Sequence, residues 1–154
     1  MAIRVILLLI IFLVLSVAAG ALSADPATIP STVPTPAPSR SVLDGVYSTE
    51  QVARGEKAYF SSCARCHGDN LLGNDDASAL VDNDFLGHWY GKSVGNLVDL
   101  TWKKMPTDGP GKLSRKQCTD MAAYLLNQNG YPVGKSDLVS DADVLKNILI
   151  EAKK

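Results

Sequence analysis

The run Cys63-Ala64-Arg65-Cys66-His67 constrains the fold of this chain more than any other feature of its sequence. Two thiols three residues apart, followed directly by an imidazole, form the C-x-x-C-H pattern of covalent c-type haem attachment. On one helical turn both thiols reach the same porphyrin edge, and the next residue brings an imidazole beneath the iron. The motif therefore predicts one covalently bound haem c, attached through Cys63 and Cys66, with His67 as an iron ligand.

Two other interpretations of this motif stay open. A thioredoxin-like redox pair also uses C-x-x-C, but it belongs to a βαβ setting that the flanking sequence does not indicate. A structural zinc site needs four protein ligands, and His88 and Cys118 would complete one, although neither is part of a second ligand pair.

The first 24 residues predict export. Arg4 is followed by an apolar run and then by small residues, which is typical of a secretory signal peptide. Val5 to Leu22 spans 18 residues, which is also the low end of a membrane-spanning helix, so a retained N-terminal anchor is the alternative. In both cases we expect the rest of the chain to be exported.

The remaining chain divides into a linker and one domain. Residues 25–41 contain five prolines and form an extended, Pro-rich linker, while residues 42–154 suit one small domain. The chain carries 15 basic and 16 acidic residues without a basic stripe, so we expect no nucleic-acid partner.

Hydrophobic periodicity predicts four helices, at about 48–61, 93–104, 114–127 and 141–151, with serine N-caps at positions 48, 93, 114 and 140. Residues 79–86 are expected to form a loop with apolar anchors. Gly55 inside the first helix costs up to about 1 kcal/mol relative to alanine, so another helix should approach closely there. Cys118 is expected to be a buried small hydrophobe, with a disulfide to a second copy or a metal ligand as alternatives.

Met105-Pro106 follows the second of these helices. Methionine is a soft thioether ligand, and the proline holds the preceding residue in an extended conformation. The sequence therefore predicts Met105 as the sixth iron ligand. Two alternatives remain, a core role for Met105 and ligation by His88 in its place.

Taken together, the domain resembles a class I cytochrome c. The resemblance covers about residues 46–150 and rests on Gly55 and Tyr59, the C-x-x-C-H-G motif, Leu72-Gly73, Met105-Pro106 and the final long helix with Tyr124-Leu125. The stretch from Met105 to Pro132 is similar to bacterial monohaem cytochromes that accompany periplasmic quinoprotein dehydrogenases. The resemblance implies an all-α fold in which the N- and C-terminal helices cross, with Gly55 against Tyr124, around the haem.

The chain departs from that family at Ser78. Such domains often carry a proline before Ala79-Leu80, and the carbonyl of that residue holds the proximal imidazole. Serine supplies the same carbonyl in a less rigid loop. We further expect the haem ring to be surrounded by a set of apolar side chains, namely Leu71, Leu72, Leu80, Phe85, Leu86, Trp89, Leu97 and Leu100. We also expect the indole N–H of Trp89 or Trp102 to donate a hydrogen bond to a haem propionate.

The resemblance implies a periplasmic one-electron carrier with His67 and Met105 as axial ligands, and not an enzyme. Its expected partners are a dehydrogenase as donor and an oxidase or another acceptor, and Lys103 and Lys104 are candidates for steering an acidic partner. Two alternatives are a haem-c enzyme or sensor with an open sixth position, and a membrane-anchored haem subunit of a dehydrogenase complex.

Overall fold

The computed structural model describes residues 39–153, so the predicted signal peptide or anchor and most of the predicted linker lie outside it. Within the described residues no helix is long and apolar enough to cross a membrane. The elements in chain order are β1 (Arg40–Ser41), the 3-10 turn η1 (Val42–Asp44), α2 (Thr49–Ser62), α3 (Ala64–His67), α4 (Asp82–Trp89), α5 (Val94–Lys104), α6 (Arg115–Gln128), α7 (Ala142–Leu145) and β2 (Ile148–Leu149).

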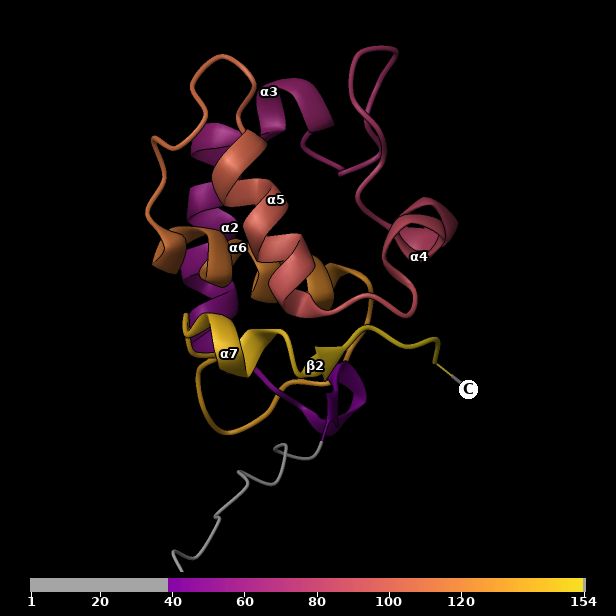
Figure 1. Cartoon of the computed structure of the whole chain (residues 1–154). Coiled ribbons are helices and arrows are strands. Elements are labelled where there is room, and N and C mark those ends of the chain that lie inside the picture. The colour runs from indigo at the N-terminus through magenta and orange to yellow at the C-terminus, as the bar shows by residue number, and fades with distance from the viewer. Residues whose placement is uncertain (1–38, 154) are drawn as a thin grey trace, which may run out of the picture. The chain divides into compact units, whose positions relative to one another are not determined.

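The domain is built on the crossing of α2 and α6, with α5 lying beside them (Figure 1). A Cβ added to Gly55 would lie 1.9 Å from the carbonyl oxygen of Asp120 and 2.9 Å from the Cβ of Tyr124. The two backbones therefore meet at a point where only glycine fits. The predicted all-α fold with crossing first and last long helices is confirmed, and so is the approach of Tyr124 to Gly55.

Serine side chains start the three long helices. The hydroxyl oxygens of Ser48, Ser93 and Ser114 accept hydrogen bonds from the backbone N–H three residues further on. Each serine thereby satisfies one of the four helix N–H groups that have no partner inside the helix. The predicted starts of α2, α5 and α6 are confirmed.

The prediction of a loop over residues 79–86 is wrong, because α4 begins at Asp82. Val81 precedes α4 with an extended backbone and gives no side-chain cap, and Phe85 is the one fully buried residue of this helix. A short helix without a polar cap and with a single buried anchor lacks the periodic pattern on which the sequence interpretation relied.

The predicted helix over 141–151 is also wrong in length and in position. Helix α7 covers only four residues and is capped by Asp141, not by Ser140. The following residues form β2, which pairs in parallel with β1 so that Arg40 lies opposite Ile148. Leu145, Ile148 and Ile150 are fully buried, so this segment is part of the core and not an outer layer.

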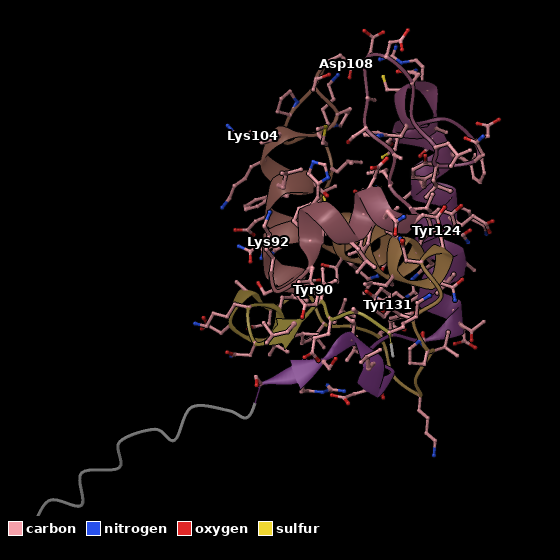
Figure 2. All side chains as sticks on the ribbon, turned by 90° about the vertical axis from the view of Figure 1, so that its right-hand side faces the viewer. Tyr90, Lys92, Lys104, Asp108, Tyr124 and Tyr131 are labelled. Atoms are coloured by element: carbon pink, nitrogen blue, oxygen red, sulfur yellow. The ribbon has the colours of Figure 1, made fainter. Side chains whose placement is uncertain are left out.

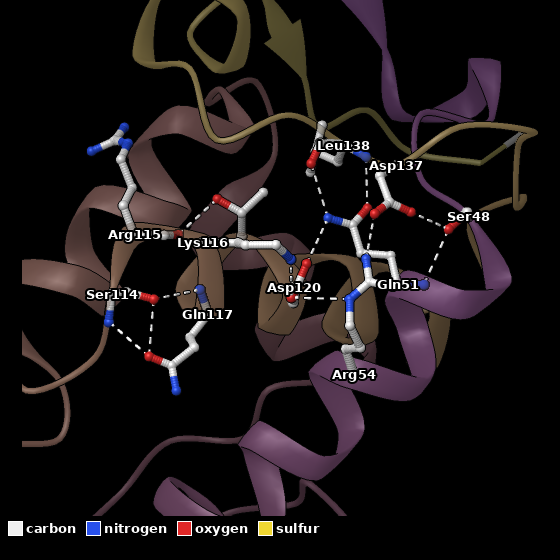
Figure 3. Close-up of polar contacts among 11 residues, drawn as sticks. Ser48, Gln51, Arg54, Ser114, Arg115, Lys116, Gln117, Asp120, Asp137 and Leu138 are labelled. Carbon is white, nitrogen blue, oxygen red and sulfur yellow. Dashed lines mark hydrogen bonds and ion pairs between the residues drawn. The ribbon is translucent and has the colours of Figure 1, made fainter.

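A buried polar network joins α2 to α6 and to the C-terminal segment (Figure 3). The Gln51 amide donates to a carboxylate oxygen of Asp120 and to the carbonyl of Leu138, both at 2.9 Å, and accepts from the Leu138 N–H at 2.6 Å. Arg54 contacts Asp120 at 3.3 Å and also pairs with Asp137. These contacts fix the segment after α6 on the α2–α6 pair.

Candidate functional site

The C-x-x-C-H motif begins where α2 ends. Cys63 follows the last residue of α2 and precedes α3, and its N–H donates to the carbonyl of Tyr59 at 2.8 Å. The N–H of His67 in turn donates to the Cys63 carbonyl at 3.0 Å. The motif therefore continues directly from α2, the helix that crosses α6. Cys63, Cys66 and Cys118 are all free thiols.

The imidazole of His67 is oriented by the backbone of Ser78. Its Nδ1 lies 2.8 Å from the Ser78 carbonyl oxygen. A carbonyl can only accept, so Nδ1 carries the proton and the lone pair of the ring is on Nε2. The expectation that serine can supply this carbonyl in place of proline is confirmed. An imidazole held in this way is oriented to bind a metal through Nε2.

The turn after His67 is fixed by two further hydrogen bonds. The buried Tyr59 donates its hydroxyl proton to the Gly68 carbonyl at 2.6 Å, and the Gly73 N–H donates to the His67 carbonyl at 2.9 Å. Burial raises the pKa of Tyr59, so its hydroxyl stays a donor at any physiological pH. The sequence placed Tyr59 on a helix face but gave no signal for its bond to Gly68.

Met105 directly follows α5 as its C-cap residue. It is half-buried, its backbone is extended with φ −120° and ψ 148°, and its N–H donates to the Thr101 carbonyl at 3.1 Å. Pro106 follows and starts the loop to α6. The backbone of Met105 is thus held from one side by α5, and its extended conformation is the one predicted for a residue before proline.

Apolar side chains that the protein leaves uncovered lie along the segments next to the motif and Met105. Leu72 follows the motif by five residues and is 56 % exposed, and Leu100 of α5 is 43 % exposed. Of the predicted apolar set, Leu80, Leu86 and Trp89 are half-buried, whereas Leu71, Phe85 and Leu97 are buried in the core. The exposed side chains of Leu72 and Leu100 offer apolar surface against which a planar apolar group can pack.

The competing interpretations of the motif find little support in the described residues. Residues 39–153 contain no group of three or more His, Cys, Asp or Glu side chains able to hold a metal ion. Burial raises the pKa of Cys63 to about 11, whereas a thioredoxin-like pair needs a thiol with a lowered pKa. His88 is exposed on α4, with its Nδ1 2.9 Å from the Asp84 carbonyl. Cys118 is buried, as expected of a small core residue.

The two tryptophans make cation–π contacts. The Lys92 ammonium lies 5.5 Å from the ring centre of Trp89, and the Arg115 guanidinium lies 5.4 Å from that of Trp102. In the described part of the chain neither indole N–H has a hydrogen-bond partner within the protein. The expected bond to a haem propionate therefore stays a prediction.

A second contact of the motif was also missed by the sequence interpretation. Arg65, between the two cysteines, donates to the carboxylate of Asp108 at 2.5 Å, and Asp108 lies three residues after Met105. The two residues are 43 positions apart, and no local pattern indicates such a pair. The contact brings the motif next to the loop that begins at Met105.

The donor set fits a covalently attached haem. Two free thiols on one helical turn, an imidazole whose Nε2 lone pair is free, a methionine at a helix end and uncovered apolar side chains are the groups that this cofactor uses. The arrangement is that of a class I c-type cytochrome, an electron-transfer protein with covalently bound haem c and its iron.

The comparison with protein families agrees with this class. Residues 50–125, from the start of α2 into α6, match the family described as cytochrome c oxidase, cbb3-type, subunit III. No curated protein matches the chain. A solved structure, the sulfane dehydrogenase SoxCD from Paracoccus pantotrophus, is 24 % identical with a TM-score of 0.43, over 80 % of this chain and 62 % of that chain. The chain thus spans less than two thirds of that neighbour's length.

Proposed function

We propose that the protein is an exported one-electron carrier whose single haem is attached by Cys63 and Cys66 and has His67 and Met105 as axial ligands. It would accept electrons from a dehydrogenase and pass them to a respiratory chain in the periplasm. The observation that carries the ligand assignment is the hydrogen bond from His67 Nδ1 to the Ser78 carbonyl, because it leaves Nε2 free to bind iron.

The bound haem supplies reversible one-electron chemistry. The ligands that this chain supplies would determine that the haem is used for electron transfer. With His67 and Met105 both bound to the iron, no coordination position would be left for oxygen or a substrate. This pair of ligands would also raise the reduction potential. Leu72 and Leu100 would pack on the ring and exclude water, which favours the less charged reduced iron.

The surface near Met105 offers one candidate for steering a partner. Lys103 pairs with Asp99 at 2.8 Å, so its charge is partly compensated. Lys104 is exposed and has no ion pair within residues 39–153. Figure 2 shows Lys104 toward the same end of this face as Asp108. Of the two lysines that the sequence singled out, Lys104 is the better candidate to meet an acidic partner, through electrostatic attraction that salt weakens.

The ligand assignment is tested by the visible spectrum of the holoprotein, made in a host with haem-c maturation. We expect low-spin spectra, with the weak far-red band of methionine bound to ferric iron. Met105→Ala should abolish this band. Met121→Leu is the matched control, because Met121 is buried 3.6 Å from the Cys63 sulfur and should not be a ligand. It should keep the band.

The other outcomes separate the alternatives. A low-spin spectrum without the far-red band, changed by His88→Ala, would assign the sixth ligand to His88. A high-spin spectrum with ready binding of carbon monoxide would favour a haem enzyme or sensor. Covalent haem that is present in the wild type and absent in the double variant Cys63→Ser/Cys66→Ser would support attachment through these cysteines. Absence of covalent haem in the wild type would contradict the attachment.

Export and attachment are tested on the full chain in cell fractions. Recovery of holoprotein in the soluble periplasmic fraction would support a cleaved leader and a diffusible carrier. Recovery of the holoprotein in the membrane fraction would support the anchored subunit. In that case, a variant in which a cleavable leader replaces residues 1–24 should be recovered in the soluble fraction.

A further inference from the structure

The loop that begins after Met105 has very few polar contacts with the rest of the domain, although Leu113 at its end packs against the core. The backbone hydrogen bonds of residues 106–113 join Gly109 to Pro106 and Lys112 to Gly109, so they lie within the loop. The Lys112 ammonium, 3.5 Å from the Asp108 carbonyl, also stays inside it. Among the described residues the pair of Arg65 with Asp108 is the one polar contact that leaves this loop.

This contact spans a groove. The groove has a volume of about 320 Å³ and lies between the C-terminal end of α2, with Phe60 and Ser62, and the loop, with Pro106 and Leu113. Figure 1 shows α3 and the loop between α5 and α6 at the same end of the domain. Without the ion pair, solvent would separate the middle of the loop from the C-x-x-C-H motif.

The position of the pair in the sequence gives it a specific consequence. Arg65 lies between the thiols of the motif and two residues before His67, and Asp108 lies three residues after Met105. The pair thus connects the segment that carries the imidazole with the segment that carries the thioether. Any movement of the loop away from α3 would stretch this contact.

We propose that Arg65 and Asp108 are positioning residues that hold the Met105 loop against the haem-attachment motif and so keep the Met105 sulfur at the iron. This inference rests on the proposed function, because it requires Met105 to be the sixth ligand. The guanidinium and the carboxylate form a charge-assisted hydrogen bond, which is stronger than a neutral one.

The effect of the Arg65–Asp108 pair on Met105 ligation is expected to be small. The side chains of Arg65 and Asp108 are 76 % and 54 % exposed, so water and salt screen the pair. Pairs of this kind change an equilibrium by about 1.5-fold to 5-fold. The same change is expected in the fraction of molecules in which Met105 has left the iron, and it should shrink at high salt.

This fraction is measured by titrating the ferric holoprotein with imidazole, which binds only when Met105 has dissociated. The far-red band reports the loss of the methionine bond. Asp108→Asn should raise the apparent affinity for imidazole by about 1.5-fold to 5-fold at low salt, and Arg65→Gln by a similar factor. Asp108→Asn is the primary variant because it leaves the attachment motif unchanged.

Two controls separate positioning from a general effect of charge or of folding. Lys112→Gln removes a charge from the same loop without breaking a contact across the groove, and it should leave the imidazole affinity unchanged. In the double variant R65Q/D108N the second substitution should add little to the first, because both remove the same contact. The exchanged pair R65D/D108R should restore part of the wild-type affinity.

The outcomes are distinguishable. A wild type without the far-red band would overturn the ligand assignment and the positioning role together. A wild type with the band, whose Asp108→Asn and Arg65→Gln variants behave like Lys112→Gln, would overturn the positioning role alone. Additive effects of the two substitutions, with no recovery in the exchanged pair, would also overturn it.

Discussion

The hydroxyl of Tyr59 donates a 2.6 Å hydrogen bond to the carbonyl of Gly68, the residue that directly follows His67. Tyr59 lies on α2, so this bond fastens the far end of the C-x-x-C-H motif to the helix from which the motif starts. The ring of Tyr59 also packs on Tyr124 of α6, with ring centres 5.4 Å apart. One side chain thus ties the motif to both of the crossing helices.

Removal of this hydroxyl should destabilise the domain. Tyr59→Phe leaves the Gly68 carbonyl without its partner, and we expect the free energy of unfolding to fall by about 0.5–1.5 kcal/mol. Guanidinium denaturation of the holoprotein measures the change. Tyr124→Phe is the control, because the Tyr124 hydroxyl makes no hydrogen bond within the described residues. Equal losses in the two variants would contradict the role of the Tyr59 bond.

The crossing of α2 and α6 should not tolerate a methyl group at position 55. The Cβ of Gly55→Ala would lie 1.9 Å from the Asp120 carbonyl oxygen, so the helices must separate. We expect a loss of at least about 2 kcal/mol in the free energy of unfolding. Gly87→Ala on α4 has no atom within 4 Å of the added Cβ and should instead stabilise by about 0.5–1 kcal/mol. An unchanged free energy of unfolding in Gly55→Ala would show that α2 and α6 can separate at the crossing without cost.

The amide of Gln51 should be needed to hold the segment after α6. In Gln51→Leu the buried N–H and carbonyl of Leu138 lose their partners, at a cost of about 1–3 kcal/mol. Hydrogen exchange should show faster exchange at the Leu138 amide in particular. Gln128→Leu, at the exposed end of α6, is the matched control and should leave that amide protected. Unchanged exchange in Gln51→Leu would contradict the role of the network.

The stability of the domain should depend on pH through Asp99. Hydrogen bonds from Lys103 and Arg115 hold the pKa of Asp99 below its usual range. A lowered folded-state pKa adds stability that is present above the unfolded-state pKa of about 4 and disappears as the pH falls through the folded-state value. Asp99→Asn should therefore lower the urea midpoint at pH 6, and its difference from the wild type should shrink as the pH falls below about 4. Asp75→Asn, at an exposed position without an ion pair in residues 39–153, is the control, and its urea midpoint should stay equal to that of the wild type.

The sequence predicted what local signals specify. The starts of α2, α5 and α6 follow from serine caps, and the close approach at Gly55 follows from the cost of glycine inside a helix. The position of the motif after α2 was predicted as well. The assignment of Cys63, Cys66, His67 and Met105 stays a prediction that the spectra must test.

The sequence could not predict what distant segments specify. Val144, Leu145, Ile148 and Leu149 have helical spacing, but pairing of Ile148 with Arg40 turns this stretch into a strand. The contact of Gln51 with Leu138 spans 87 positions, and that of Arg65 with Asp108 spans 43. Such pairs become visible only when the chain is folded, because either partner alone has an ordinary surface or helical pattern.

The parallel pairing of β1 with β2 also determines how the domain would be presented if its N-terminus were held. Figure 1 places these strands at one end of the domain and α3 at the other. The chain therefore enters the domain at the pole opposite to the C-x-x-C-H motif. A redox partner that approaches from the side opposite to β1 and β2 would therefore meet the motif first.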